Sequence, residues 1–403
     1  MSRRSWAKLL VVALLPLVLG VSGGVPAAPA YRFTMDAGPN VETIGGWMAE
    51  NVLAKAGESA TRAPATQDED VTYFGLVGRL LRLSRSAGDI SAGRSGYGEA
   101  AAPELPSLQA QLGDLRPGVE RSLQQQVAEV LQQSGLGRRV AGRELLFPPV
   151  LFRFESPPYL LVVSPRDRIE QTATVLLRSD MTLPEAEHLE DTVSGRGYSA
   201  LVTQIGGLGV YPSIVPESSD VRWALRTVAH EWAHQFFASR PLGWRYAFGA
   251  ETDNRMVSVN ETAADILGRE VGDEAFRRYY LEPGQQPPPP SSRDDTFRKR
   301  MRDIRAQVDP LLAQGKMEEA ESFMESARQD LGRRGYVLRK LNQAYFAFYG
   351  SYSDELSLGG AQGDEVGNRL HSLRDRSASL GDFAWKVSSV GSYDDLRRLT
   401  ASP

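Results

Sequence analysis

Apolar and polar residues alternate along this chain with two different periods. In the first third, apolar residues recur every three to four positions over 41–55, 71–83 and 118–134, which predicts amphipathic helices. A stretch rich in Gly, Ala, Ser and Pro at 86–106 predicts a loop between the last two helices. We expect these helices to pack into a core rather than to carry function.

Near residue 145 the pattern changes to short runs rich in β-branched and aromatic residues, which predict strands. The runs are bounded by Pro and Gly, as strands of a small sheet are. The predicted elements of this region are strands at 150–154, 159–163, 172–177, 198–205 and 209–214, with one helix at 183–193.

Helical periodicity returns in the second half of the chain. A helix is predicted from Val221 to Ala238, because Asp220 can cap its start and Pro241 follows its end. We expect an ordered loop over 243–255 after it. The remaining predicted helices span 259–271, 296–312, 317–334 and 338–349.

These elements predict an α+β protein. With 403 residues, the chain is long enough for two domains or for one domain with a helical extension. We expect four regions: an N-terminal export segment at 1–30, a helical region at 31–144, a compact core at 145–282 and a helical C-terminal region at 283–403.

The N-terminus has the layout of a secretory signal peptide. Arg3, Arg4 and Lys8 precede an apolar run at 9–21, which small residues follow, so cleavage is expected before Tyr31. An uncleaved membrane anchor is the alternative. Both alternatives predict an extracytoplasmic protein, either secreted or held in the cell envelope.

Composition and charge exclude several classes of function. The chain has no cysteine, which excludes disulfides, thiolate metal ligands and a cysteine nucleophile. The net charge of -4 gives no reason to expect a nucleic-acid partner.

The pentapeptide His230-Glu231-Trp232-Ala233-His234 contains two of the four histidines in the chain. Residues four apart lie on the same face of a helix, so the rings of His230 and His234 can converge on one cation. Glu231 stands beside them as a candidate general base for a metal-activated water. The pattern indicates a Zn²⁺ site in which these two histidines are ligands.

A catalytic zinc usually has a third protein ligand, and the best candidate lies in Asn260-Glu261-Thr262-Ala263-Ala264-Asp265. Together with the first motif, this segment resembles the gluzincin metallopeptidases. The resemblance implies a zincin-like catalytic core at 145–282, Glu261 as the third ligand, and Asp265 as the acceptor for a ligand histidine. The 26 residues between His234 and Glu261 exceed the spacing in the best-known gluzincins.

A weaker resemblance, to a group of predicted bacterial aminopeptidases, extends to Leu341-Asn342-Gln343-Ala344-Tyr345. It implies that Asn342, Tyr345 or Tyr349 approaches the site. Tyr345, Tyr349 and Tyr352 are candidates for the group that stabilises an oxyanion.

Structural roles compete with several of these assignments. His230 and His234 could be core histidines, and Ser258 to Glu261 fits a capping box in which Glu261 serves only the helix start. The remaining histidines, His188 and His371, are expected at the surface.

We therefore expect an exported zinc-dependent peptidase that acts on a peptide or protein substrate. The alternatives are a non-enzymatic envelope protein on a degenerate peptidase scaffold, and a zinc hydrolase of non-peptide bonds. The sequence leaves open the specificity, the oligomeric state and whether residues 31–140 cover the cleft as a pro-segment.

Overall fold

The computed structural model describes residues 28–61, 63–84, 104–140, 142–247, 253–282, 285, 292–349 and 361–401. Over these residues the protein is mostly helical with small sheets, in agreement with the predicted α+β class. The predicted export segment at 1–30 lies almost wholly outside the described residues. None of the described helices is long and apolar enough to span a membrane.

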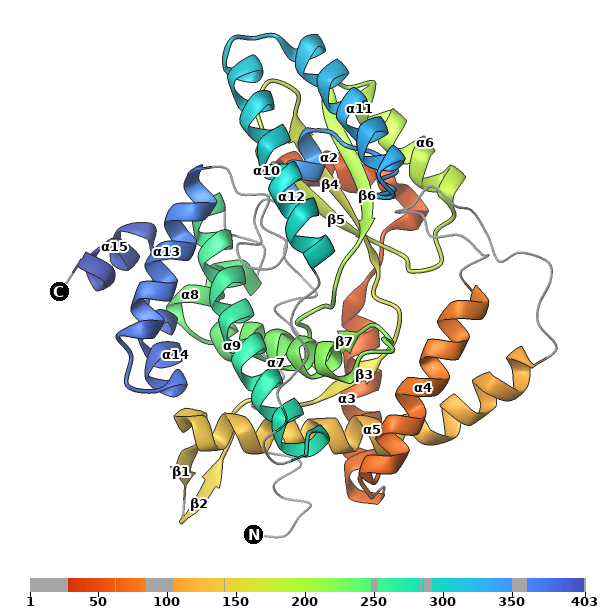
Figure 1. The fold of residues 1–403 in the computed structure, drawn as a ribbon, viewed down its shortest axis with the longest axis vertical. Coiled ribbons are helices and arrows are strands. Elements are labelled where there is room, and N and C mark those ends of the chain that lie inside the picture. Colours follow the sequence, from red (N-terminus) through yellow and green to blue (C-terminus); the bar gives the residue numbers. More distant parts are fainter. Residues whose placement is uncertain are drawn as a thin grey trace.

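An antiparallel sheet occupies the upper part of the molecule in Figure 1. Its strand order is β5 (Ala173–Leu177), β4 (Tyr159–Pro165) and β6 (Tyr198–Gln204). Because successive side chains of a strand point to opposite faces, each strand can serve two cores. Leu161 of β4 packs with the helices of one face, and Val162 with those of the other. The helices are α2 (Ala28–Ala37) and α6 (Leu183–Ser194) on the first face, and α10 (Ser292–Ala313), α11 (Met317–Arg333) and α12 (Gln343–Tyr349) on the second.

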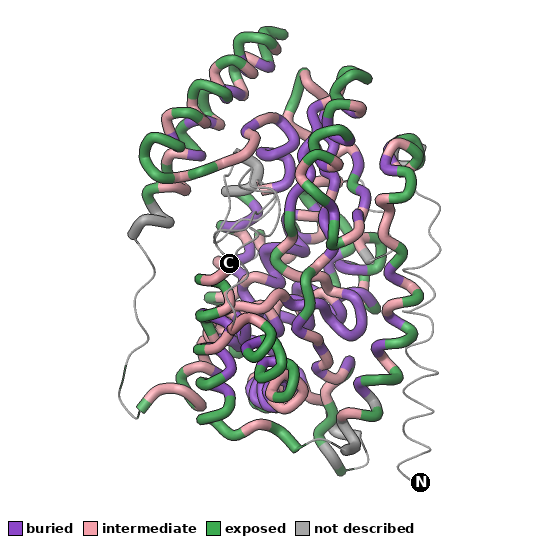
Figure 2. The backbone as a smooth tube through the Cα atoms, turned by 90° about the vertical axis from the view of Figure 1, so that its right-hand side faces the viewer, coloured by how far each residue is buried: buried purple, intermediate pink, exposed green. Residues whose placement is uncertain are grey.

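The largest hydrophobic core lies below the sheet in Figure 1 and combines helices from distant parts of the chain. Figure 2 shows the buried residues gathered in the interior, with exposed residues along the outer helices. The helices are α4 (Gln67–Ser84), α5 (Leu105–Leu131), α7 (Val221–Ala238), α9 (Asn254–Tyr280), α13 (Ala361–Asp375), α14 (Leu380–Ser388) and α15 (Tyr393–Ala401). The short strands β3 (Phe152–Phe154) and β7 (Ser213–Val215) pair in parallel and contribute side chains to the same core. The strands β1 (Arg138–Val140) and β2 (Arg143–Leu145) form a hairpin.

Helix α3 (Ile44–Thr61) packs the N-terminal region against the rest of the protein. Ile44 and Met48 are buried against Tyr211, next to the strand β7. Further along the helix, Lys55 forms a buried ion pair with Glu120 of α5. The described part of residues 31–140 is therefore built into the cores of the protein.

Several predicted boundaries are corrected by the structure. The helix predicted at 118–134 begins at Leu105, because Leu108 and Leu112 continue its buried face past Pro117. The helix predicted at 338–349 begins only at Gln343, where the Oδ1 atom of Asn342 accepts a hydrogen bond from the backbone of Tyr345 at 2.9 Å.

Two further predictions were wrong between the strands and the motif helices. The strand predicted at 209–214 is limited to Ser213–Val215, because Tyr211 turns into the core against α3. The loop predicted at 243–255 contains a helix, α8 (Pro241–Ala247). Most residues between α8 and α9 lie outside the described part of the chain.

Candidate metal centre

Helix α7 presents the two histidines of the pentapeptide. Its start is fixed by Asp220, whose Oδ1 accepts hydrogen bonds from the backbone nitrogens of Arg222 (2.9 Å) and Trp223 (3.1 Å). The bulky apolar face of the helix is buried in the large core. His230 and His234 therefore lie on the other side, one turn apart, facing α9.

Helix α9 carries the acidic partner. It begins at Asn254 behind the cap Asp253, and the hydroxyl of Ser258 donates to the Asn254 carbonyl at 3.1 Å, so the capping box proposed at Ser258 does not form. Glu261 lies well inside the helix and its side chain is free to point toward α7. Close approach of the helices depends on Gly268, where a Cβ would lie 2.8 Å from the Cβ of His230.

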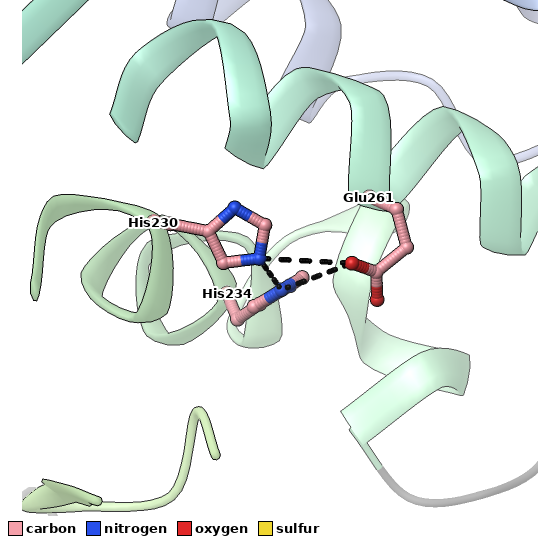
Figure 3. A group of neighbouring side chains, drawn as sticks. All are labelled: His230, His234 and Glu261. Carbon is pink, nitrogen blue, oxygen red and sulfur yellow. Dashed lines mark hydrogen bonds and ion pairs between the residues drawn. The ribbon is translucent and has the colours of Figure 1, made fainter. Parts of the chain in front are cut away.

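Three ligand atoms converge between the two helices (Figure 3). The Nε2 atoms of His230 and His234 lie 3.0 Å apart, and the Oε2 of Glu261 lies 3.6 Å from each. That oxygen is buried and has no hydrogen-bond partner. An unpaired carboxylate oxygen in the interior is costly unless a cation or a donor satisfies it. The three residues could therefore hold a metal ion.

The other nitrogen of each imidazole ring is bound to a side chain of α9. The Nδ1 of His230 lies 2.8 Å from the Oδ1 of Asp265, as predicted for a ligand histidine, and the Nδ1 of His234 lies 2.7 Å from the Oδ1 of Asn260. Both oxygens are acceptors, so both Nδ1 atoms carry hydrogen and each neutral ring offers a lone pair at Nε2. Two such lone pairs 3.0 Å apart require a proton or a cation between them.

Burial and charge shift the pKa values of these groups in different directions. Burial works against charge on the His230 ring, but the combined effect of the Asp265, Glu261 and Glu231 carboxylates outweighs it and raises the pKa of His230. Burial lowers the pKa of His234. Although burial also opposes its ionisation, Glu261 has its pKa lowered to about 2 by the histidine rings and by the hydroxyl of Tyr246. The site therefore favours an ionised carboxylate beside a neutral His234.

Glu231, the candidate general base, points to the chain segment that follows β6. Burial raises the pKa of Glu231 to about 7, and the neighbouring Glu261 and Asp265 carboxylates act in the same direction. A Cβ at Gly207 would lie 2.2 Å from its Oε1, and one at Gly209 would lie 3.3 Å from its Oε2. This glycine-containing segment therefore lies directly against the carboxylate.

The sequence did not identify two residues that contact the candidate metal ligands His234 and Glu261. Asn260 precedes Glu261 in the motif, and its contact with His234 could have been inferred from that neighbourhood. Tyr246 had no such signal. Its hydroxyl donates to the Oε1 of Glu261, and its ring stacks on that of His234 with centroids 5.5 Å apart.

The tyrosines expected near the site are placed on the sheet side of the molecule. Tyr349 has its hydroxyl 3.0 Å from the Oγ1 of Thr203, and its ring contacts that of Tyr345. Asn342 donates to the carbonyl of Ala200 at 2.9 Å. Tyr352 lies outside the described residues. Comparisons with protein families, with curated proteins and with solved structures find no match to this chain.

Proposed function

We propose that this protein is a zinc-dependent hydrolase of gluzincin type, an exported peptidase with a zincin-like catalytic core. The observation that carries the proposal is the convergence of two histidine lone pairs and one unpartnered carboxylate oxygen beside Glu231. A structural zinc site needs no general base, whereas this site has a buried carboxylate next to its ligands.

The donor atoms fit zinc in kind and in spacing. Separations of 3.0, 3.6 and 3.6 Å define a triangle whose circumcentre lies about 2.0 Å from each atom. Zinc is bound by imidazole nitrogen and carboxylate oxygen at about 2.0–2.2 Å. Two histidines and one glutamate are also the ligand set of well-known zinc peptidases, which keep a fourth position open.

The chemistry divides between the metal and the side chains around it. Zinc bound here would supply a Lewis acid that polarises a carbonyl and lowers the pKa of a water. His230, His234 and Glu261 would hold it, while Asp265 and Asn260 keep the two rings in the tautomer that leaves Nε2 free. Glu231 would accept a proton from the water as its oxygen bonds to the carbonyl carbon, and would donate that proton to the amine that leaves when the C–N bond breaks.

The segment beside Glu231 favours a peptide as the substrate. Within the described residues, the backbones of Gly207 and Gly209 form no hydrogen bond, although Leu208 between them pairs with Ile214. Unpaired backbone next to the reacting groups can bind an extended peptide through main-chain hydrogen bonds. Glycines at these positions leave the main chain accessible.

Metal analysis and a peptide-library assay test the proposal together. We expect about one zinc per chain, lost in His230→Ala, and chelator-sensitive hydrolysis that Glu231→Gln abolishes while zinc is retained. If the purified protein takes up no metal when zinc is supplied, the proposed metal site is absent and the proposal is contradicted. Zinc binding without cleavage of any peptide would instead favour the non-enzymatic protein or the hydrolase of non-peptide bonds.

A further inference from the structure

Helix α8, between the two motif helices, is packed tightly against the end of α7. Leu242 is buried in the large core. A Cβ at Gly243 would lie 2.4 Å from the backbone carbon of Phe237, so only glycine allows this approach. The position of α8 relative to the histidine helix is therefore set by backbone-to-backbone contact.

Two contacts connect α8 to the ligand set. The carbonyl of Leu242 accepts a hydrogen bond from the Nδ2 of Asn260 at 3.5 Å, which leaves the Oδ1 of that amide facing His234. The hydroxyl of Tyr246 donates to the Oε1 of Glu261. One short helix thus reaches the outer side of two ligands.

The contact at Glu261 makes its two carboxylate oxygens different. Oε1 is bound by the Tyr246 hydroxyl, whereas Oε2 is buried, without a hydrogen-bond partner, and 3.6 Å from both histidine nitrogens. A carboxylate free to rotate could offer both oxygens to a metal. Here the phenol directs one of them away from the point where the ligand atoms converge.

We propose that Tyr246 is a positioning residue that makes Glu261 a ligand through one oxygen only. The inference rests on the proposed metal site. A second oxygen from Glu261 would fill the position that a hydrolytic zinc site keeps for water and substrate. The ring of Tyr246, nearly parallel to His234 with an interplanar angle of 14°, keeps the hydroxyl in place.

The test compares Tyr246→Phe with wild type after loading with Co²⁺, whose visible absorption is strong in four-coordinate sites and weak at higher coordination. The variant keeps the ring on His234 and loses only the hydroxyl. We expect weaker visible bands, and a zinc affinity about tenfold lower by competition with a chromophoric chelator. Tyr349→Phe, which removes a hydroxyl bound to Thr203, is the matched control and should retain the wild-type spectrum.

An unchanged Co²⁺ spectrum in Tyr246→Phe overturns the inference, whatever happens to hydrolysis. Loss of hydrolysis with that unchanged spectrum would show that the phenol acts on the substrate instead. Failure of the proposed function is a different result, because it is seen in wild type itself: the protein binds neither Zn²⁺ nor Co²⁺, or it binds zinc and cleaves no peptide.

Discussion

Gly207 lies so close to Glu231 that a Cβ at this position would come within 2.2 Å of the Oε1 atom. Because the end of the glutamate side chain can move, we expect Gly207→Ala to displace the carboxylate rather than to unfold the protein. Displacement of a catalytic group by about 1 Å can cost about 100-fold in rate. Peptide hydrolysis should fall by about this factor, with zinc content unchanged, as measured by kcat and metal analysis.

The neighbouring glycine provides the control. A Cβ at Gly206 would meet nothing within 4 Å, so Gly206→Ala should hydrolyse peptides at nearly the wild-type rate. Equal activity of both alanine variants would contradict the assigned role of Glu231.

The hydrogen bond from His230 to Asp265 predicts a graded loss of metal affinity. Asp265→Ala removes the acceptor and should weaken zinc binding about 10- to 100-fold, whereas Asp265→Asn retains an acceptor oxygen and should weaken it less. Chelator competition measures both. Glu270→Ala, on the same helix but paired with Arg374, should bind zinc like wild type. Equal losses in all three variants would point to a general effect on α9.

Zinc should stabilise the folded protein, because its three ligand atoms come together only when α7 and α9 pack against each other. The unfolded chain has no such site. At a zinc concentration 100 times the Kd, the gain in unfolding free energy is about 2.7 kcal/mol. The unfolding temperature should therefore rise when zinc is added and fall back to its original value when a chelator removes the zinc. His230→Ala should unfold at the same temperature with and without zinc.

A buried carboxyl that is not part of the candidate metal centre, that of Asp70, predicts a pH-dependent stability. Burial is the main cause that raises the pKa of Asp70 to about 6, although Ser122, Tyr280 and Gln126 donate hydrogen bonds that oppose the shift. The folded state then holds this proton more tightly than the unfolded state does. The stability that the group contributes is present below about pH 4 and is lost as pH rises through 6.

Urea unfolding of wild type and Asp70→Asn from pH 4 to 7 measures this contribution. The difference in their unfolding free energies should change by an amount on the order of 3 kcal/mol, in favour of wild type at low pH. Parallel curves would mean that Asp70 titrates in the folded protein as it does in the unfolded chain.

The ion pair between Lys55 and Glu120 predicts that α3 is essential to the fold. The side chains are 3% and 2% exposed, and the Oε1 of Glu120 also accepts a hydrogen bond from the backbone of Phe154 at 2.6 Å. Lys55→Met leaves a buried carboxylate unpaired and should cost about 3–5 kcal/mol of unfolding free energy. Leu53→Ala, at a position 65% exposed on the same helix, should cost little by the same denaturation measurement.

The parts of the candidate site that the sequence determined are those set by helical geometry. His230 and His234 share a face because they are four residues apart, and Glu261 and Asp265 repeat that spacing on α9. The start of α7 was predicted from the cap Asp220, and its end from Pro241. These relationships are local, so residue types and spacing were sufficient to predict them.

Tertiary structure alone decided how the two helices meet and what surrounds the candidate metal ligands. The approach of α9 to α7 depends on Gly268, the contact with Glu231 on Gly207, and the contact with Glu261 on Tyr246. Each joins residues from different elements, and no periodic pattern encodes such a contact. Packing of the large core fixes the relative positions of α7, α8 and α9, and the segment that carries Gly207 packs with α3 in a separate cluster. Together these contacts set the direction in which each side chain of the site points.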